Sequence, residues 1–249
     1  MLFRSGGWYA LQQQPAPEAA PAAPEATAEA PPPEPALPPP DTATRDGFLA
    51  AHGANQPCTY ATRITAGANS GKLERFGTAP GVLADLPQSY GKAFGVAPAT
   101  VDRVISAEQC AVLELLRGLQ GRQDVQPSLV IDSDVVSSGG NIIGRVTDVR
   151  GRSVWLFLVT TAGGVYNVSS RLEPQPDGSQ IFGFGMSQAA GSTAQPQLLV
   201  ALASDAPIAS AAAGSDGAAA SVLLPLVLNE VIARSGGAAG QVAFFALQP

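Results

Sequence analysis

The pattern of apolar and polar positions changes along the chain, and each change marks a different structural unit. Residues 42–52 have the spacing of a short helix. Residues 58–65 and 72–76 alternate as paired strands do, on either side of a glycine-containing turn at 67–71. This part of the sequence therefore predicts a helix followed by a β-hairpin.

A helix, a strand and a second helix are predicted next. Helical spacing spans 81–94, although Pro87 interrupts it, and 101–105 alternates as a strand. Ser106 is placed to cap a helix, whose apolar stripe consists of Ala107, Cys110, Ala111, Leu113, Leu115 and Leu116. The order β-β-α-β-α predicts a small two-layer α/β domain over residues 46–126. That order is similar to the order in BON-type modules of bacterial envelope proteins.

From residue 127 onward strand patterns dominate, and they predict a β-rich domain over 127–249. The predicted strands are 128–131, 141–149, 154–159, 165–168, 180–185, 197–204 and 242–247. Residues 154–159 are apolar almost without a break, which predicts a central strand. One helix is predicted at 221–234, ended by Gly236 and Gly237. The domain is expected to be β-sandwich-like with one late helix, so the fold class of the chain is α+β.

A proline-rich segment precedes both predicted domains. Eleven of the 22 prolines lie between Pro15 and Pro40, interleaved with alanine and glutamate. Such a sequence favours extended polyproline II, and residues 15–45 are interpreted as a disordered tether, of which Pro15 to Asp41 could span roughly 80 Å if fully extended. A ligand for a proline-binding domain is the alternative, but no Lys or Arg flanks the repeats to orient a docked peptide.

The first 14 residues are interpreted as a membrane-proximal remnant. Trp8 and Tyr9, followed by a glutamine run, match the aromatic belt at the end of a membrane-spanning helix. No apolar run of about 20 residues is present here, so the anchor itself is expected upstream of Met1. An ordinary disordered amino terminus is the alternative.

Composition narrows the possible functions. Charged residues make up 14% of the chain and its net charge is -6. Nucleic-acid binding requires clustered Lys and Arg, and the 14 such residues are spread thinly. We therefore expect no nucleic-acid partner. Aromatic residues are scarce at 6%, which predicts cores packed largely from small side chains.

Cys58 and Cys110 are the two cysteines of the chain. A disulfide between them would close a loop of about fifty residues and contribute about 4 kcal/mol in the chain-entropy model. Such a bond would suit a domain outside the cytoplasm. The alternative is that both are small buried apolar residues. A metal site is not expected, because there is no CxxC spacing and His52 is the single histidine.

Several short motifs suggest chemistry, but each lacks a required residue. The glycine-rich turn at 67–72 departs from the phosphate-binding pattern at Ala66 and Leu73. Ser187 stands in a glycine-rich stretch without the spacing of a nucleophile elbow. Asp132, Asp134 and Asp148 lack the spacing of an EF-hand calcium loop. We therefore expect no catalytic, cofactor-binding or metal-binding residues, and protein-kinase motifs are absent from the sequence.

Three stretches carry a resemblance to a known group of proteins: QCAVLELLRGL, the pair IIGRV and GRSVWLFLVTTAGGVYNV, and PQLLVALASDAPI. Over residues 55–247 the chain resembles the carboxy-terminal region of proteobacterial serine/threonine protein kinases and caspase-like proteins. In these, a membrane helix and a proline-rich tether follow the enzyme domain. The resemblance implies a place on the periplasmic face of the inner membrane, and it implies no catalytic residue for this chain.

The sequence thus predicts a non-catalytic sensory or binding tail of a single-pass bacterial membrane protein. Its partner is expected to be an unidentified component or protein of the envelope. An envelope scaffold or a secretion-associated assembly module is the alternative, and a hydrolase of unfamiliar type is a third.

Overall fold

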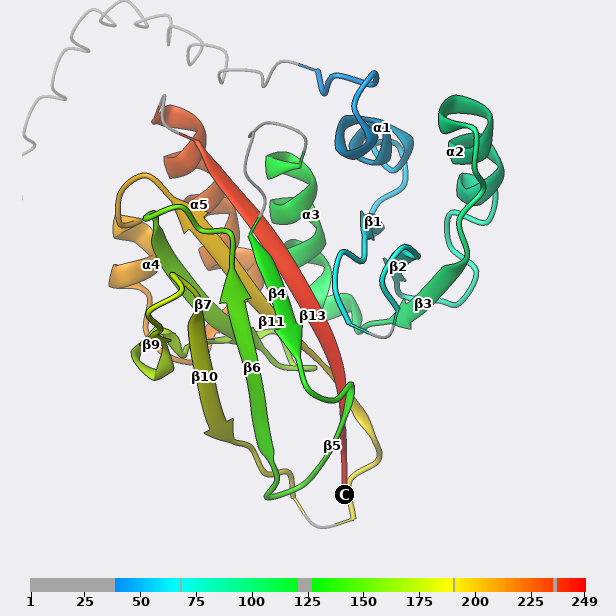
Figure 1. Cartoon of the computed structure of the whole chain (residues 1–249). Helices are drawn as coiled ribbons and strands as arrows, with labels where there is room; N and C mark the ends of the chain where they lie inside the picture. Colours follow the sequence, from blue (N-terminus) through cyan, green and yellow to red (C-terminus); the bar gives the residue numbers. More distant parts are fainter. Residues whose placement is uncertain (1–38, 68, 121–126, 190, 235–236) are drawn as a thin grey trace, which may run out of the picture. The chain divides into compact units, whose positions relative to one another are not determined.

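Strands with alternating apolar residues form three β-sheets in the computed structural model (Figure 1). The structure describes residues 39–249 except 68, 121–126, 190, 235 and 236. The predicted membrane-proximal remnant (1–14) and most of the tether (15–45) lie outside the described residues. The described residues belong to one compact unit, Leu37–Pro249. None of the helices described combines the length and the apolar character needed to span a lipid bilayer.

The first sheet has the strand order β1-β2-β3, with the strands Tyr60–Arg63, Leu73–Gly77 and Thr100–Val104. β1 and β2 are antiparallel, as the predicted hairpin requires, whereas β3 runs parallel to β2. Helices α1 (Arg45–His52) and α2 (Leu86–Phe94) share a small core with this sheet. α2 begins at Leu86 rather than at residue 81, because Pro87 is favourable only in the first turn of a helix.

The remaining sheets form a sandwich. One has the order β4-β6-β10-β9, with the strands Ser128–Ile131, Asn141–Thr147, Gln180–Gly185 and Glu173–Pro174. The other has the order β12-β8-β7-β11-β13-β5, with the strands Ala218–Ala219, Gly164–Asn167, Ser153–Val159, Gln195–Ser204, Ala238–Gln248 and Val135–Ser137. The α+β class, with a small α/β part and a β-sandwich-like part, is therefore confirmed.

Residues 154–159 of β7 and 198–203 of β11 are apolar without a break because both faces of their sheet are buried. Phe157 and Val200 belong to the core on the helical side, while their neighbours Leu158 and Leu199 belong to the core between the two sheets. A half-exposed strand alternates apolar and polar residues, whereas a strand covered on both faces does not. The predicted central position of residues 154–159 follows from the same burial, since β7 lies between β8 and β11.

Three helices pack beside the six-stranded sheet (Figure 1): α3 (Cys110–Leu119), α4 (Ala209–Ala213) and α5 (Ala220–Ala233). α3 contacts α5, β13 and β1, so it is shared between the sandwich and the first sheet. Its apolar side chains, such as Leu113 and Leu116, lie in one core with Phe76 of β2 and Leu202 of β11. The predicted boundary between a domain at 46–126 and one at 127–249 falls on residues 121–126, outside the described part. The core on either side of that boundary is continuous.

The described residues hold several short elements that the residue pattern did not predict. β5 has three residues, β9 and β12 have two each, and the 3₁₀ turn Ser169–Arg171 has three, and windows this short give no measurable alternation. α4 occupies the alanine-rich stretch before α5, where the spacing of apolar residues carries no periodic signal. β13 also begins at Ala238, four residues before the predicted start at 242. The prediction missed these residues because Ala238 and Ala239 are flanked by glycine, and alanine and glycine are not typical of strands, although both alanines are buried here.

Glu230 of α5 ties α4 in place. The backbone N–H groups of Ala209 and Ser210 donate to its two carboxylate oxygens, each at 2.7 Å, and Arg234 forms an ion pair with it. Burial by itself would raise the pKa of Glu230, but the hydrogen bonds from Ser210 and Ala209 and the charge of Arg234 lower that pKa to about 2. The carboxylate thus satisfies N–H groups at the start of α4 that have no helical partner.

We expect Glu230→Gln to lower the free energy of unfolding by about 2 kcal/mol at pH 7, the typical contribution of hydrogen bonds to a charged group. The pKa of this carboxyl is lower in the folded chain than in the unfolded chain, so its stabilisation is present above pH 4.5 and is lost as the pH falls toward 2. Urea unfolding at several pH values measures this. Equal acid sensitivity of the variant and the parent chain would contradict it.

Candidate binding groove

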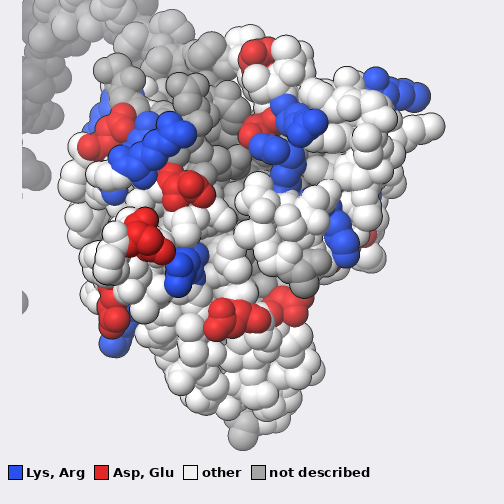
Figure 2. Space-filling model, viewed as in Figure 1, with Lys and Arg blue, Asp and Glu red and all other residues white. Residues whose placement is uncertain are grey.

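A groove with charged walls lies between the first sheet and the open side of the sandwich, and we call it the β13 groove. Its volume is about 310 Å³. It is lined by the β1–β2 turn, Glu74, Arg103, residues 128–134 and residues 241–244. Figure 2 shows acidic and basic side chains close together over the face that carries β4 and β13, and an uncharged lower end of the sandwich.

One side of the β13 groove is an unpaired strand edge. β13 pairs with β11 from Ala238 to Leu247, but on its other side it pairs with β5 only at residues 246–248. The N–H of Ala246 donates to the carbonyl of Asp134 on that side. Alternate residues of a strand direct their backbone groups to the same side, so the N–H and C=O groups of Val242 and Phe244 also face it. No described strand pairs with them.

The opposite wall offers a second open edge. β4 is the outermost strand of its sheet. The N–H of Asp132 donates to Ile143 of β6 at 3.0 Å, so residues 128 and 130 also turn toward β6. By the same alternation the backbone groups of Leu129 and Ile131 turn away from β6 and toward the groove. Unpaired edges of this kind are sites where an extended polypeptide can add a strand.

Arg103 of β3 connects the two sides of the groove. Its Nε donates to Glu74 of β2 at 2.7 Å and its Nη1 to Asp134 of the sandwich at 3.1 Å. Its guanidinium also lies over the ring of Phe244, 4.9 Å from the ring centre. The side chains of Arg103 and Glu74 are only 14% and 9% exposed. Arg103 therefore acts as a bridge that fixes the first sheet against β13.

Glu74 is the buried member of this cluster. Burial raises the pKa of its carboxyl, and the hydrogen bond and charge of Arg103 lower it only in part. The net direction is upward, which means that desolvation outweighs the attraction of the arginine. Arg103 thus holds the carboxylate of Glu74 in place and partly offsets the unfavourable burial of its charge.

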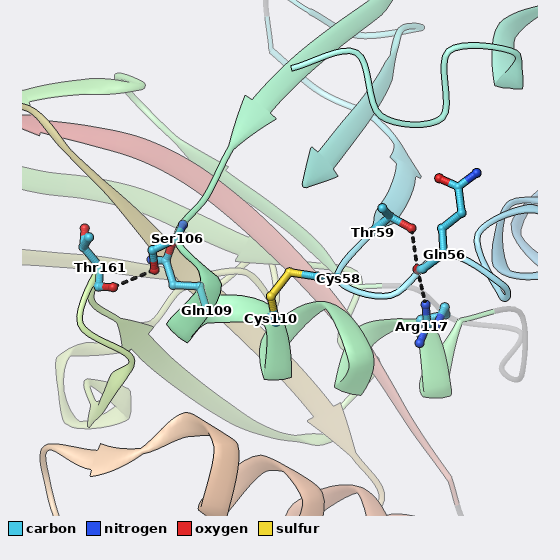
Figure 3. The surroundings of a disulfide bond; sticks show 8 residues. All are labelled: Gln56, Cys58, Thr59, Ser106, Gln109, Cys110, Arg117 and Thr161. Atoms are coloured by element: carbon cyan, nitrogen blue, oxygen red, sulfur yellow. Dashed lines mark hydrogen bonds between the residues drawn. A yellow bond between two sulfur atoms is a disulfide. The ribbon is translucent and has the colours of Figure 1, made fainter. Parts of the chain in front are cut away.

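The predicted disulfide is confirmed: Cys58 and Cys110 are bonded, with their Cα atoms 4.8 Å apart (Figure 3). Cys110 is the first residue of α3, and Cys58 lies just before β1. Further along α3, Nη1 of Arg117 donates to the carbonyl of Gln56 at 3.1 Å. Before the helix, Ser106 Oγ donates to the carbonyl of Thr161 at 2.6 Å. These contacts fasten the segment before β1 and the β7–β8 turn to one helix.

No model of a protein family, no curated protein and no solved structure matches the chain. The groove is therefore interpreted from its own contacts, and the likeness to the carboxy-terminal region of membrane-anchored kinases stays a prediction.

The motifs considered in the sequence lie in different places. The glycine-rich turn at 67–72 joins β1 to β2, and Lys72 Nζ donates to Asn69 within it at 2.9 Å. Nε2 of His52 in α1 lies 3.3 Å from Oδ2 of Asp85, and the His52 ring stacks on the ring of Phe48. Ser187 follows β10, in the turn region between β10 and β11. The described residues hold no group of three or more potential metal ligands.

Of the three aspartates considered together, two line the groove and one does not. Asp132 and Asp134 lie between β4 and β5. Asp148 lies in the β6–β7 turn, where its backbone has a positive φ of 59° that Asp and Asn tolerate better than other side chains. Asp148 thus occupies a turn, whereas Asp132 and Asp134 contribute acidic groups to the groove.

Arg103 and Glu74 were not recognised as site residues from the sequence. They stand on neighbouring parallel strands, but pairing of β2 with β3 is not encoded by a local turn. The available signal was a charged residue at an inward position of each short strand, which is rare unless the charges are paired. Such a signal indicates that a partner exists but does not identify it.

We expect Gly144→Ala to deform the β4 wall of the groove. An added Cβ would overlap the carbonyl oxygen of Val130 on β4 and approach the ring of Phe182 on β10. Forced overpacking of this kind lowers the free energy of unfolding by about 2 kcal/mol. Gly183→Ala is the matched control, because its Cβ would meet only Ile143, at 4.0 Å. Urea unfolding compares the two, and equal losses would contradict the proposed crowding.

Proposed function

We propose that the chain is a non-catalytic binding module that takes up an extended polypeptide segment in the β13 groove. The observation that carries this proposal is the unpaired edge of β13 at Val242 and Phe244, which lines a charged hollow beside β4. Strand addition supplies main-chain hydrogen bonds from the edge and specificity from the side chains around it. The binding partner would be a protein of the compartment in which the module folds.

That compartment is proposed to be the periplasm. The Cys58–Cys110 bond is compatible with an oxidising space outside the cytoplasm, where disulfides persist. Within the proposal, the module is the carboxy-terminal tail of a single-pass membrane protein, a serine/threonine kinase-like regulator, as the sequence resemblance implies. Determining the coding sequence upstream of Met1 tests this part. A kinase signature followed by a hydrophobic span is the expected result, and the absence of both would contradict it.

Hydrogen exchange of the full oxidised chain tests the binding mode. The probe is a neutral hexapeptide of alternating threonine and valine, compared with the same peptide N-methylated at every second residue. The unmodified peptide should slow amide exchange at Val242 and Phe244 about tenfold, which corresponds to about 1.4 kcal/mol of added protection. The N-methylated peptide cannot complete the strand pairing and should have no effect.

Two outcomes would contradict the proposed binding mode. Unchanged amide exchange along β13 in the presence of the unmodified peptide would rule out strand addition at this edge. Equal protection by the N-methylated peptide would show that backbone pairing is not involved. A stable stoichiometric complex of the chain with an envelope protein, formed at another surface, would favour the scaffold alternative instead.

A further inference from the structure

The charges around the β13 groove are unbalanced, and this bears on which segment it can accept. Its lining holds three acidic residues, Glu74, Asp132 and Asp134, and one basic residue, Arg103. Three negative charges and one positive charge leave a net charge of -2 in the lining. Lys72 is not part of the lining, and its amine is hydrogen-bonded to Asn69.

The one arginine does not neutralise the whole groove. Arg103 is shared between Glu74 and Asp134 through its Nε and Nη1. Asp132 is exposed, and its carboxylate has no hydrogen bond or ion pair within the described part of the chain. An anionic segment would thus meet two nearby carboxylates, while a cationic side chain could pair with Asp132 and with the exposed side of Asp134, which Arg103 contacts through one oxygen.

The acidic residues also lie in the path of a strand added to β13. The backbone carbonyl of Asp134 accepts a hydrogen bond from the N–H of Ala246, directly before β5 begins at Val135, so this residue lies on the edge of β13. A segment paired with Val242 and Phe244 would continue the line of β5 along the same edge. Four residues of β13 line the groove, a length of about 13 Å at ~3.3 Å per residue. A long basic side chain on such a segment can reach Asp132 and Asp134.

Resting on the proposed function, we infer that the β13 groove selects an extended segment of another protein that carries a lysine or arginine, held by Asp132 and Asp134. The backbone edge provides the pairing and the carboxylates provide the choice of sequence. A second copy of this chain is a less suitable occupant, because it would bring its own acidic surface to an acidic site. The chain has a net charge of -6.

The test uses the full oxidised chain and two fluorescent hexapeptides that match in their threonine and valine residues. One carries lysine at two positions and the other carries glutamate at the same positions. We expect the lysine peptide to bind about tenfold more tightly by fluorescence anisotropy, because attraction in one complex is compared with repulsion in the other. Raising the salt concentration should reduce this ratio.

Two variants locate the effect. Asp132→Asn removes the exposed carboxylate and should reduce the preference for lysine to about threefold. Asp148→Asn makes the same chemical change in the β6–β7 turn, outside the groove, and should leave the preference unchanged.

The possible failures are distinguishable. Equal binding of both peptides, with loss of binding on N-methylation, would overturn the preference for a basic segment while leaving strand addition in place. Binding of neither peptide, nor of the neutral one, would overturn the proposed function itself. A preference that Asp148→Asn lowers as much as Asp132→Asn would show that net charge, rather than the groove, is responsible. Concentration-dependent self-association that blocks the peptides would assign the edge to a second copy of the chain.

Discussion

Replacing Cys58 and Cys110 together with alanine is expected to lower the free energy of unfolding by about 4 kcal/mol. The bond joins residues that are 52 positions apart. In the unfolded chain it closes a long loop and so removes conformational freedom, and a loop of this size corresponds to about 4 kcal/mol in the chain-entropy model. The folded geometry adds to this dependence, because Cys58 also packs against the main core.

Urea unfolding of three samples measures the contribution of this bond: the oxidised chain, the chain reduced with dithiothreitol, and the double alanine variant. The reduced chain and the variant should agree with each other and should unfold at lower urea than the oxidised chain. Agreement of all three midpoints would contradict a stabilising role. A midpoint lower for the variant than for the reduced chain would assign part of the effect to packing of the cysteine side chains rather than to the bond.

Arg103→Met is expected to lower the free energy of unfolding by about 3 kcal/mol at pH 7. It removes the partner of Glu74, whose side chain is only 9% exposed. Breaking a buried ion pair from one side leaves an uncompensated charge and is more destabilising than removing both partners. Methionine keeps the apolar length of the side chain beside Phe244, so the loss should report the charge.

The pH dependence of this variant separates the charge from packing. The pKa of Glu74 is already raised in the folded chain by burial, and without Arg103 it should rise further. A carboxyl with a raised pKa in the folded state is protonated there while it is still ionised in the unfolded state. Its unfavourable effect is therefore small near pH 4.5 and grows as the pH increases through the folded pKa. The loss measured for Arg103→Met should accordingly be smaller at pH 5 than at pH 7.

The double variant Arg103→Met with Glu74→Gln is the control for this interpretation. Removing both charges should recover part of the stability lost in Arg103→Met alone, because no ionised group then remains buried. A double variant that is less stable than the single variant, together with a loss that is the same at pH 5 and pH 7, would show that Arg103 acts through shape instead. The peptide-binding experiments apply to these variants as well, since Arg103 connects the two walls of the β13 groove.

The strongest correct predictions came from elements whose signal is local. The hairpin of β1 and β2, the capped helix that becomes α3, and the apolar run of β7 all follow from neighbouring residues. Ser106 caps the helix as predicted, and its N–H donates to the side chain of Gln109, although the first turn is a 3₁₀ turn, Ala107–Gln109. The disulfide could be proposed because only one pairing of two cysteines exists within the chain. Whether it forms depended on the distance between them.

The β13 groove could not be predicted because it is assembled from segments far apart in the chain. Its walls come from β2, β3, β4 and β13, and the pairing that ends at Ala246 leaves the edge of β13 open. Nothing in residues 241–244 records that β5 stops short of them. The same reason hides the bridge from Arg103 to Asp134, which are 31 positions apart.

By itself the sequence determined the fold class, most of the strands and helices, and the pair of cysteines. These depend on periodicity, composition and local caps, which act over a few residues. Only the tertiary structure decided that α3 is shared between the first sheet and the sandwich, and that the edges of β4 and β13 face a charged hollow. The tertiary structure also placed Arg103 at the junction of the first sheet and the sandwich. Those features depend on which surfaces are buried against each other, and burial is a property of the whole folded chain.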